Sequence, residues 1–197
     1  MPVDRTTGLR ERKKARTRAA IQSHALRLFR EQGYDATTVT QIIEEVEVSE
    51  STFFRYFPTK ADVVLADEFD PVIVAAFREQ PMEMNVIQAL RAAFSQAFAR
   101  MGDDERAVQE DRMLLVMSVP ELRAGMLDQF AQAMGLLAEI IAERTGRLPN
   151  EVSVRTFAGA VVGAAMAAMF TIADDPSSDI AVTLDQSMAC LEDGLRL

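Results

Sequence analysis

Residues 37–60, TTVTQIIEEVEVSESTFFRYFPTK, constrain the fold of this chain more than any other stretch. Apolar residues recur there at helical spacing and predict a short helix with one apolar face: Val39, Ile42, Ile43 and Val46. Thr38, with Gln41 three residues later, predicts a capping box at its start. A break at residues 47–49 precedes a second short helix, which Pro58 ends. Two short helices around a three-residue turn are typical of a helix-turn-helix.

This stretch resembles the DNA-binding domain of tetracycline-repressor-type (TetR-family) regulators. The resemblance covers about residues 15–65 and is carried by T-T-V-x-x-I followed by V-S-x-S-T-F-F-x-Y-F-P-T-K. Two residues depart from the family pattern. Glu47 stands in the turn where the family usually has Gly, so it must adopt a left-handed backbone conformation at some cost. Ser51 replaces a second common Gly, and a small hydroxyl residue there is compatible with a nearby phosphate.

The resemblance implies specific DNA contacts when its motif is carried over position by position. The residues implied to hold phosphates are Thr38, Thr52, Tyr56 and Lys60. The residues implied to face the bases are Thr40, Glu50, Ser51, Phe54 and Arg55. By side-chain chemistry Arg55 suits guanine, Glu50 suits the amino group of cytosine, and Phe54 suits the methyl group of thymine.

Charge is distributed unevenly along the chain, whose formal net charge is -9. Residues 1–60 hold eleven Lys and Arg against eight Asp and Glu, whereas residues 61–197 hold ten against twenty-two. The basic side chains gather before the helix-turn-helix, at Arg10, Arg12, Lys13, Lys14, Arg16 and Arg18. A basic arm in this place is what contact with DNA phosphates requires, although a merely solvated basic tail is the alternative.

Apolar spacing and helix breakers predict an all-α fold of about nine helices. We expect a disordered arm over residues 1–9 and a first helix over 9–32, with Gly33 left-handed at its end. After the helix-turn-helix we expect a helix over 60–77 interrupted at Pro71, then helices over 85–101, 104–118, 120–144, 150–173 and 178–195. Residues 1–62 would form the DNA-binding domain, and residues 63–197 a larger effector-binding and dimerisation domain.

Flexible apolar side chains in the second domain predict a cavity for a small-molecule effector. The set consists of Phe94, Phe98, Met113, Met117, Phe130 and Met134. Ordinary core is the alternative for each residue alone, and the cavity rests also on the resemblance, because TetR-family members hold an effector in this domain. The FFRYF wording and the run from Arg112 to Leu122 resemble the mycofactocin-regulator branch, which responds to long-chain acyl-CoA. The expected effector is therefore apolar and lipid-like.

Residues 156–173, TFAGAVVGAAMAAMFTIA, carry no charge and reach the length of a transmembrane helix. The alanine-rich composition, the adjoining Arg155 and the lack of a flanking aromatic or basic belt argue against insertion of this segment into a membrane. Small residues at Gly159, Gly163 and Ala167 permit close approach of another helix. The resemblance implies that the last two helices pair with those of a second subunit, which predicts a homodimer.

Groups for catalysis or metal binding are scarce in the sequence. A single histidine, His24, and a single cysteine, Cys190, leave no zinc or Cys/His catalytic set, and the lone cysteine fits a reducing cytoplasm. The sequence has no Gly-rich phosphate loop, no G-x-S-x-G and no H-E-x-x-H. We therefore expect no enzyme, metal or cofactor. The prediction is a cytoplasmic, homodimeric repressor that binds double-stranded operator DNA and is released by its effector; an effector-dependent activator and a protein-binding helical adaptor with a degenerate helix-turn-helix are the alternatives.

Overall fold

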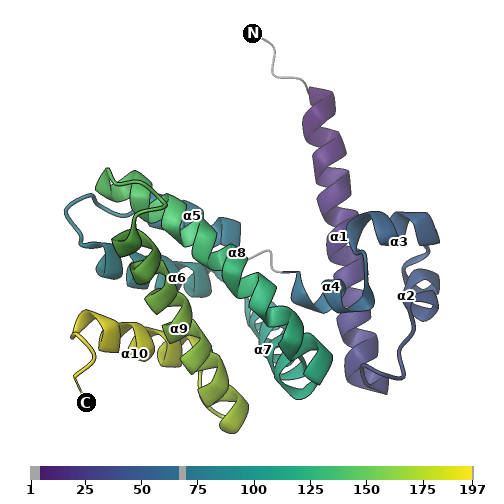
Figure 1. The fold of residues 1–197 in the computed structure, drawn as a ribbon. Coiled ribbons are helices and arrows are strands. Elements are labelled where there is room, and N and C mark those ends of the chain that lie inside the picture. Colours follow the sequence, from purple (N-terminus) through teal and green to yellow (C-terminus); the bar gives the residue numbers. More distant parts are fainter. Residues whose placement is uncertain (1–4, 67–69, 197) are drawn as a thin grey trace. The chain divides into compact units, whose positions relative to one another are not determined.

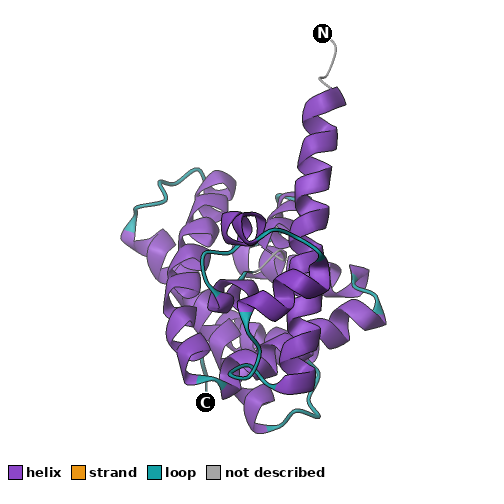
Figure 2. Ribbon diagram, turned by 90° about the vertical axis from the view of Figure 1, so that its right-hand side faces the viewer, coloured by secondary structure: helices purple, strands orange, loops and turns teal. Residues whose placement is uncertain are grey.

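The computed structural model describes residues 5–66 and 70–196, and these ranges form ten helices and no strand (Figure 1, Figure 2). The first five helices are α1 (Arg5–Gln32), α2 (Val39–Val46), α3 (Glu50–Tyr56), α4 (Lys60–Leu65) and α5 (Asp70–Arg78). The others are α6 (Val86–Arg100), α7 (Asp103–Ser118), α8 (Pro120–Thr145), α9 (Val152–Asp174) and α10 (Ile180–Glu192). The all-α class is confirmed. The count exceeds the expected nine because the helix expected over residues 60–77 is divided into α4 and α5.

The chain divides into two compact units, Met1–Ala66 and Asp67–Leu197. α4 belongs to the first unit because it packs against α1, with Val63 and Val64 fully buried. The expected boundary after residue 62 falls within this helix, whereas the compact units divide after Ala66.

α1 begins earlier than the sequence predicted. Residues 5–9 are helical rather than part of a disordered arm, and residues 1–4 lie outside the described ranges. The Arg, Lys, Ala and Glu residues that follow have high helix propensity, which favours extension of the helix toward the N-terminus. At the other end Gly33 has a φ of 88°, and its N–H donates to the carbonyl of Phe29 at 2.9 Å. The predicted left-handed end of this helix is confirmed.

α9 is the central helix of the second unit and packs against α7, α8 and α10. Seven of its side chains are buried at helical spacing: Val154, Ala158, Val161, Val162, Ala164, Ala168 and Ile172. By length and composition alone α9 could cross a membrane, and it is the one such helix among the described residues. The burial of this face shows that α9 supplies much of the core of the second unit.

α6 and α10 are joined by a charged network around Arg91. The guanidinium of Arg91 donates to both carboxylate oxygens of Asp185, each at 2.8 Å, and to Glu192 at 2.6 Å. Glu192 also accepts from Gln88 at 2.7 Å. The hydrogen bond from Arg91 lowers the pKa of Asp185, and the hydrogen bonds from Gln88 and Arg91 lower the pKa of Glu192. Both carboxylates thus favour their charged forms in the folded chain.

This network should make the stability of the second unit dependent on pH. Because folding lowers both carboxyl pKa values, their stabilising contribution is complete above the ordinary values of 3.8 and 4.5 and is lost as the pH falls through the lowered values. Arg91→Met should lower the free energy of unfolding by about 1 kcal/mol at neutral pH, since the pair is partly exposed and screened. The loss should shrink as the pH falls below the ordinary values and the carboxyl groups take up protons.

Urea denaturation at neutral and acid pH measures both effects. Arg78→Met is the matched control, because Arg78 pairs with Glu143 in a more exposed position and should cost less. An Arg91→Met chain with the pH dependence of the wild type would contradict a stabilising role for the network.

Candidate nucleic-acid interface

Local hydrogen bonds set the start of α2 and the turn that follows it. The hydroxyl of Thr38 accepts from the N–H of Gln41 at 3.2 Å, and the side chain of Gln41 accepts from the N–H of Thr38 at 2.8 Å. This confirms the predicted capping box. Glu47 has φ 55° and ψ 42°, so it adopts the left-handed conformation expected of it. A residue with a Cβ is strained there, and the surrounding turn must hold it in place.

α3 has one buried and one exposed side. Phe53 is fully buried and its ring lies 6.1 Å from that of Phe57, which is also buried. On the other side Phe54 has 44% of its surface exposed. The predicted base-facing residues of α3 are all exposed, namely Glu50, Ser51, Phe54 and Arg55, and Thr40 of α2 is exposed as well. Burial of Phe53 therefore determines which side of the helix is available to a partner.

Hydroxyl groups surround the N-terminus of α3. Ser49 is its N-cap and accepts from the N–H of Thr52 at 3.2 Å. The Ser49 hydroxyl also lies 2.8 Å from that of Thr52 and 3.1 Å from that of Ser51. Ser49 was not among the predicted contact residues, although a Ser three residues before Thr52 is an N-cap signal.

The predicted phosphate-contacting residues are placed differently from one another. Thr38 is exposed, whereas Thr52, Tyr56 and Lys60 are half-buried. The guanidinium of Arg55 lies 5.2 Å from the centre of the Tyr56 ring. Arg55, predicted to face bases, therefore packs against Tyr56, predicted to contact a phosphate. Stacking of this kind is weakly favourable at an exposed site and limits the conformations of Arg55 before DNA is bound.

Lys60 has partners within the chain that the sequence did not reveal. Its ammonium group donates to the carbonyl of Tyr34 at 2.8 Å and to that of Thr37 at 3.1 Å, and lies 4.1 Å from the centre of the Tyr34 ring. The buried hydroxyl of Thr37 donates in turn to the carbonyl of Gly33 at 2.8 Å. Lys60 therefore joins the start of α4 to the turn that carries Thr38.

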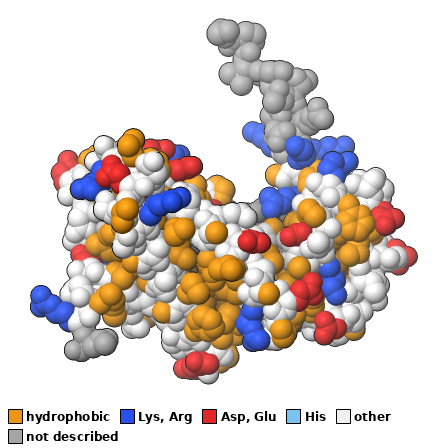
Figure 3. All heavy atoms as spheres, viewed as in Figure 1, with side chains coloured by type: hydrophobic (Ala, Val, Ile, Leu, Met, Phe, Trp, Pro, Cys, Tyr) orange, Lys and Arg blue, Asp and Glu red, His pale blue; other side chains and the backbone are white. Residues whose placement is uncertain are grey.

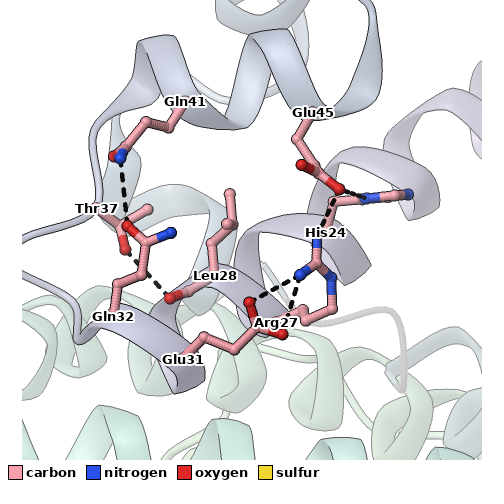
Figure 4. A network of polar contacts seen from close by, with 8 residues as sticks. All are labelled: His24, Arg27, Leu28, Glu31, Gln32, Thr37, Gln41 and Glu45. Atoms are coloured by element: carbon pink, nitrogen blue, oxygen red, sulfur yellow. Dashed lines mark hydrogen bonds and ion pairs between the residues drawn. The ribbon is translucent and has the colours of Figure 1, made fainter.

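A second polar network joins α1 to α2 (Figure 4). The guanidinium of Arg27 donates to Glu31 of α1 at 2.8 Å and also to Glu45 of α2. The Nδ1 atom of His24 lies 3.6 Å from a carboxylate oxygen of Glu45. His24 is half-buried, and the described residues contain no cluster of three His, Cys, Asp or Glu side chains that could hold a metal ion.

Basic side chains gather along α1. Arg12, Lys13, Lys14 and Arg16 are all exposed, and Figure 3 shows Lys and Arg side chains concentrated on the upper described part of this helix. Acidic side chains are scattered over both units in the same view. The first unit therefore combines a basic helix with an exposed face of α3, which suits a partner that carries negative charge.

The predicted effector residues all lie in the second unit. They come from α6 (Phe94, Phe98), α7 (Met113, Met117) and α8 (Phe130, Met134). Met117 is buried and the other five are half-buried. Phe94, Phe98, Phe130 and Met134 pack against the main core of this unit.

The predicted interface residues on α9 differ in exposure. A Cβ at Gly159 would lie 3.7 Å from the sulfur of Met134, so Gly159 faces α8 of its own chain. Gly163 and Ala167 are exposed. They belong to a line of exposed residues at helical spacing that has Ala160, and not Gly159, as its third small member: Thr156, Ala160, Gly163, Ala167 and Phe170.

Comparison with known proteins agrees with this arrangement. Residues 21–66 match the family model of bacterial regulatory proteins of the tetR family, and residues 84–196 match that of the MftR C-terminal domain. The HTH-type transcriptional regulator TcmR of Streptomyces glaucescens is 41% identical over 146 residues, which are 71% of this chain and 65% of TcmR. A Mycobacterium tuberculosis protein named as the mycofactocin biosynthesis transcriptional regulator MftR is 25% identical over 170 residues, 85% of this chain and 84% of that protein.

Solved structures share the fold. Thermus thermophilus FadR, a repressor in complex with lauroyl-CoA, has a TM-score of 0.57 at 24% identity and covers 91% of this chain and 95% of its own. The SmeT–triclosan complex has a TM-score of 0.59 at 18% identity and covers 92% and 94%. Since the two family models together span both units, the chain belongs to the TetR family of bacterial transcriptional regulators and carries an MftR-type C-terminal domain.

Proposed function

We propose that this regulator is a cytoplasmic homodimeric repressor that binds a two-fold symmetric operator and is released by an apolar small molecule. The observation that carries the proposal is the exposed side of α3, which is bordered by hydroxyl groups and lies in the same unit as the basic side chains of α1. A short helix presented in this way can enter the major groove while its neighbours hold the phosphates.

The exposed side of α3 offers three kinds of base contact. The Arg55 guanidinium can donate two hydrogen bonds to guanine, the Glu50 carboxylate can accept from cytosine, and the Phe54 ring can pack on a thymine methyl group. Ser51 and Thr40 complete the base-facing set with short polar side chains. These five residues are the ones on which operator sequence should depend.

Thr38, Thr52, Tyr56 and Lys60 form the proposed phosphate-contacting set. Lys60 uses two of its three N–H donors on the Tyr34 and Thr37 carbonyls, so one donor and the positive charge remain for a phosphate. In this role Lys60 contributes charge to DNA binding and also holds the turn that presents Thr38.

The exposed line on α9 supports the dimer. Ala160, Gly163 and Ala167 are small, so the backbone of another helix can approach closely along this line. Two large apolar side chains are also exposed. Phe170, at the end of this line, has 51% of its surface exposed, and Val182 of α10 has 54%. A second copy that covers α9 and α10 would remove this apolar surface from water.

The effector is proposed to contact the flexible apolar side chains of α6, α7 and α8. The MftR-type domain and the lauroyl-CoA bound to the structurally similar FadR both favour a lipid-like molecule. The triclosan bound to SmeT is a reason to test smaller aromatic compounds as well. Binding can release DNA only if the effector has a higher affinity for the state that does not bind the operator. Thermal-shift screening against lauroyl-CoA, phenolic compounds and drug-like cations tests this assignment.

Selection of tight-binding duplexes from a random pool tests the DNA-binding function directly. A two-fold symmetric dimer should enrich palindromes whose half-sites lie about one helical turn, or slightly more, apart. Enrichment of a single asymmetric half-site would contradict the dimer, and a pool without enrichment would favour the adaptor alternative.

Replacing a base-facing residue and replacing a phosphate-contacting residue should weaken DNA binding in different ways. Arg55→Ala should weaken binding to the selected operator by about 1–3 kcal/mol and relax preference at one base position, with little change on random DNA. Lys60→Ala should weaken binding to all sequences alike and reduce the magnitude of the salt slope by about one. Titrations of operator and random duplex at several salt concentrations measure both quantities. Equal weakening on both duplexes with Arg55→Ala would identify Arg55 as a backbone contact.

Gly163→Leu should weaken the dimer. A Cβ added at Gly163 would have open space around it, so the subunit itself should fold normally while close helix approach is blocked. Gly135→Leu is the control, because Gly135 is also an exposed helical glycine with open space around it but lies on α8. Sedimentation velocity over a range of concentrations measures the effect. If Gly163→Leu left the dimer intact, the interface would lie elsewhere.

A further inference from the structure

α4 is the last helix of the first unit, and its stability cannot come from its own length. It has six residues, and the first unit ends directly after it at Ala66. A helix this short is unstable in water unless tertiary contacts hold it, and the last carbonyl groups of any helix find no N–H partner within the helix itself. The contacts at its two ends therefore decide how firmly it is attached to the DNA-binding helices.

The N-terminal end of α4 is held by residues nearby in sequence and by the α1–α2 turn. Thr59 and Asp62 form a capping box, with the Thr59 N–H donating to Asp62 at 2.8 Å. Lys60 adds the bonds to the Tyr34 and Thr37 carbonyls described above. This end is fixed to the same turn that presents Thr38.

The C-terminal end of α4 is capped by a side chain from another helix. The Nε2 atom of Gln22 on α1 donates to the carbonyl of Val63 at 3.0 Å and to that of Ala66 at 2.8 Å. Both bonds are partly buried, and together they use both N–H groups of the amide. One side chain of α1 therefore bridges two carbonyl groups at the end of α4.

We propose that Gln22 is a positioning residue that locks α4 to α1, so that the reading head (α1 to α4) moves as one rigid body up to the point where the second unit begins. The inference rests on the proposed binding of a dimer to two half-sites. It adds a residue outside the DNA-contacting and effector-contacting sets that would determine how strictly the spacing of those half-sites is read.

The physical consequence follows from binding at two sites. When one reading head is bound, the effective concentration of the second at its half-site depends on how stiffly the heads are connected. A rigid α4 raises the effective concentration of the second reading head at one half-site spacing and lowers it at other spacings. A frayed α4 would allow a range of spacings, with a lower affinity at the best one and no change at an isolated half-site.

Gln22→Met tests this with a side chain of similar length that has no donor. Binding of the full-length chain is measured on three duplexes: the selected operator, the operator with half a helical turn inserted between its half-sites, and a single half-site. Hydrogen exchange of residues 62–66 reports fraying of α4. Gln32→Met is the control, since Gln32 is exposed on the same helix and contacts Gln41 rather than α4.

The wild type and Gln32→Met should bind the operator far better than the lengthened duplex. Gln22→Met should reduce the ratio of these two affinities by about tenfold while it binds the single half-site normally. Exchange of residues 62–66 should be faster in Gln22→Met. Gln22→Arg, whose guanidinium can again donate to two carbonyls, should restore both the ratio and the slow exchange.

Two results would overturn the inference. One is an unchanged spacing ratio in Gln22→Met despite faster exchange. The other is an equal loss on the operator and on the single half-site, which would make Gln22 a general stabilising residue of the reading head. A wild-type chain that showed no preference for paired half-sites would instead overturn the proposed dimeric function, before any variant was compared.

Discussion

Burial of Phe53 and Phe57 is the interaction on which the reading head depends. α3 has seven residues and α2 has eight, and helices of this length do not persist in water without tertiary packing. Burying one aromatic side chain contributes roughly 1.5–3 kcal/mol, which is more than any single hydrogen bond in the turn provides. Because Phe53 faces inward, Phe54 and Arg55 must face outward, and the chemistry available to DNA follows from that orientation.

The two units use different interactions for different purposes. In the first unit the short helices are joined by polar contacts with defined geometry, from Lys60, Gln22 and Arg27, in addition to a small apolar core. Hydrogen bonds to carbonyl groups are directional, so they help to fix the relative placement of these short helices. In the second unit α9 has two distinct sides. One side is buried in the core, and the other carries a line of small, exposed residues.

Much of the DNA-binding unit could be predicted because its signals are local. The capping box of Thr38 and Gln41, the left-handed Glu47 and the left-handed Gly33 each depend on residues within about four positions of one another. The apolar spacing that placed Ile42 inward is equally local. Predictions about partners stay predictions, because they depend on contacts between distant residues or between molecules. The effector set is half-buried or buried, as core residues also are, and Gly159 is half-buried beside Met134.

By itself the sequence determined the all-α class, the register of the helix-turn-helix, the side of α3 that is exposed and the membership of the family. Only the tertiary structure decided what Lys60 and Gln22 do, where the first unit ends and which line of α9 is open. The bonds of Lys60 join residues 23 and 26 positions apart, and those of Gln22 join residues 41 and 44 positions apart. A spacing pattern records which side of a helix is apolar, but it does not record which distant carbonyl group a polar side chain will reach, because that depends on how the packed helices place their ends.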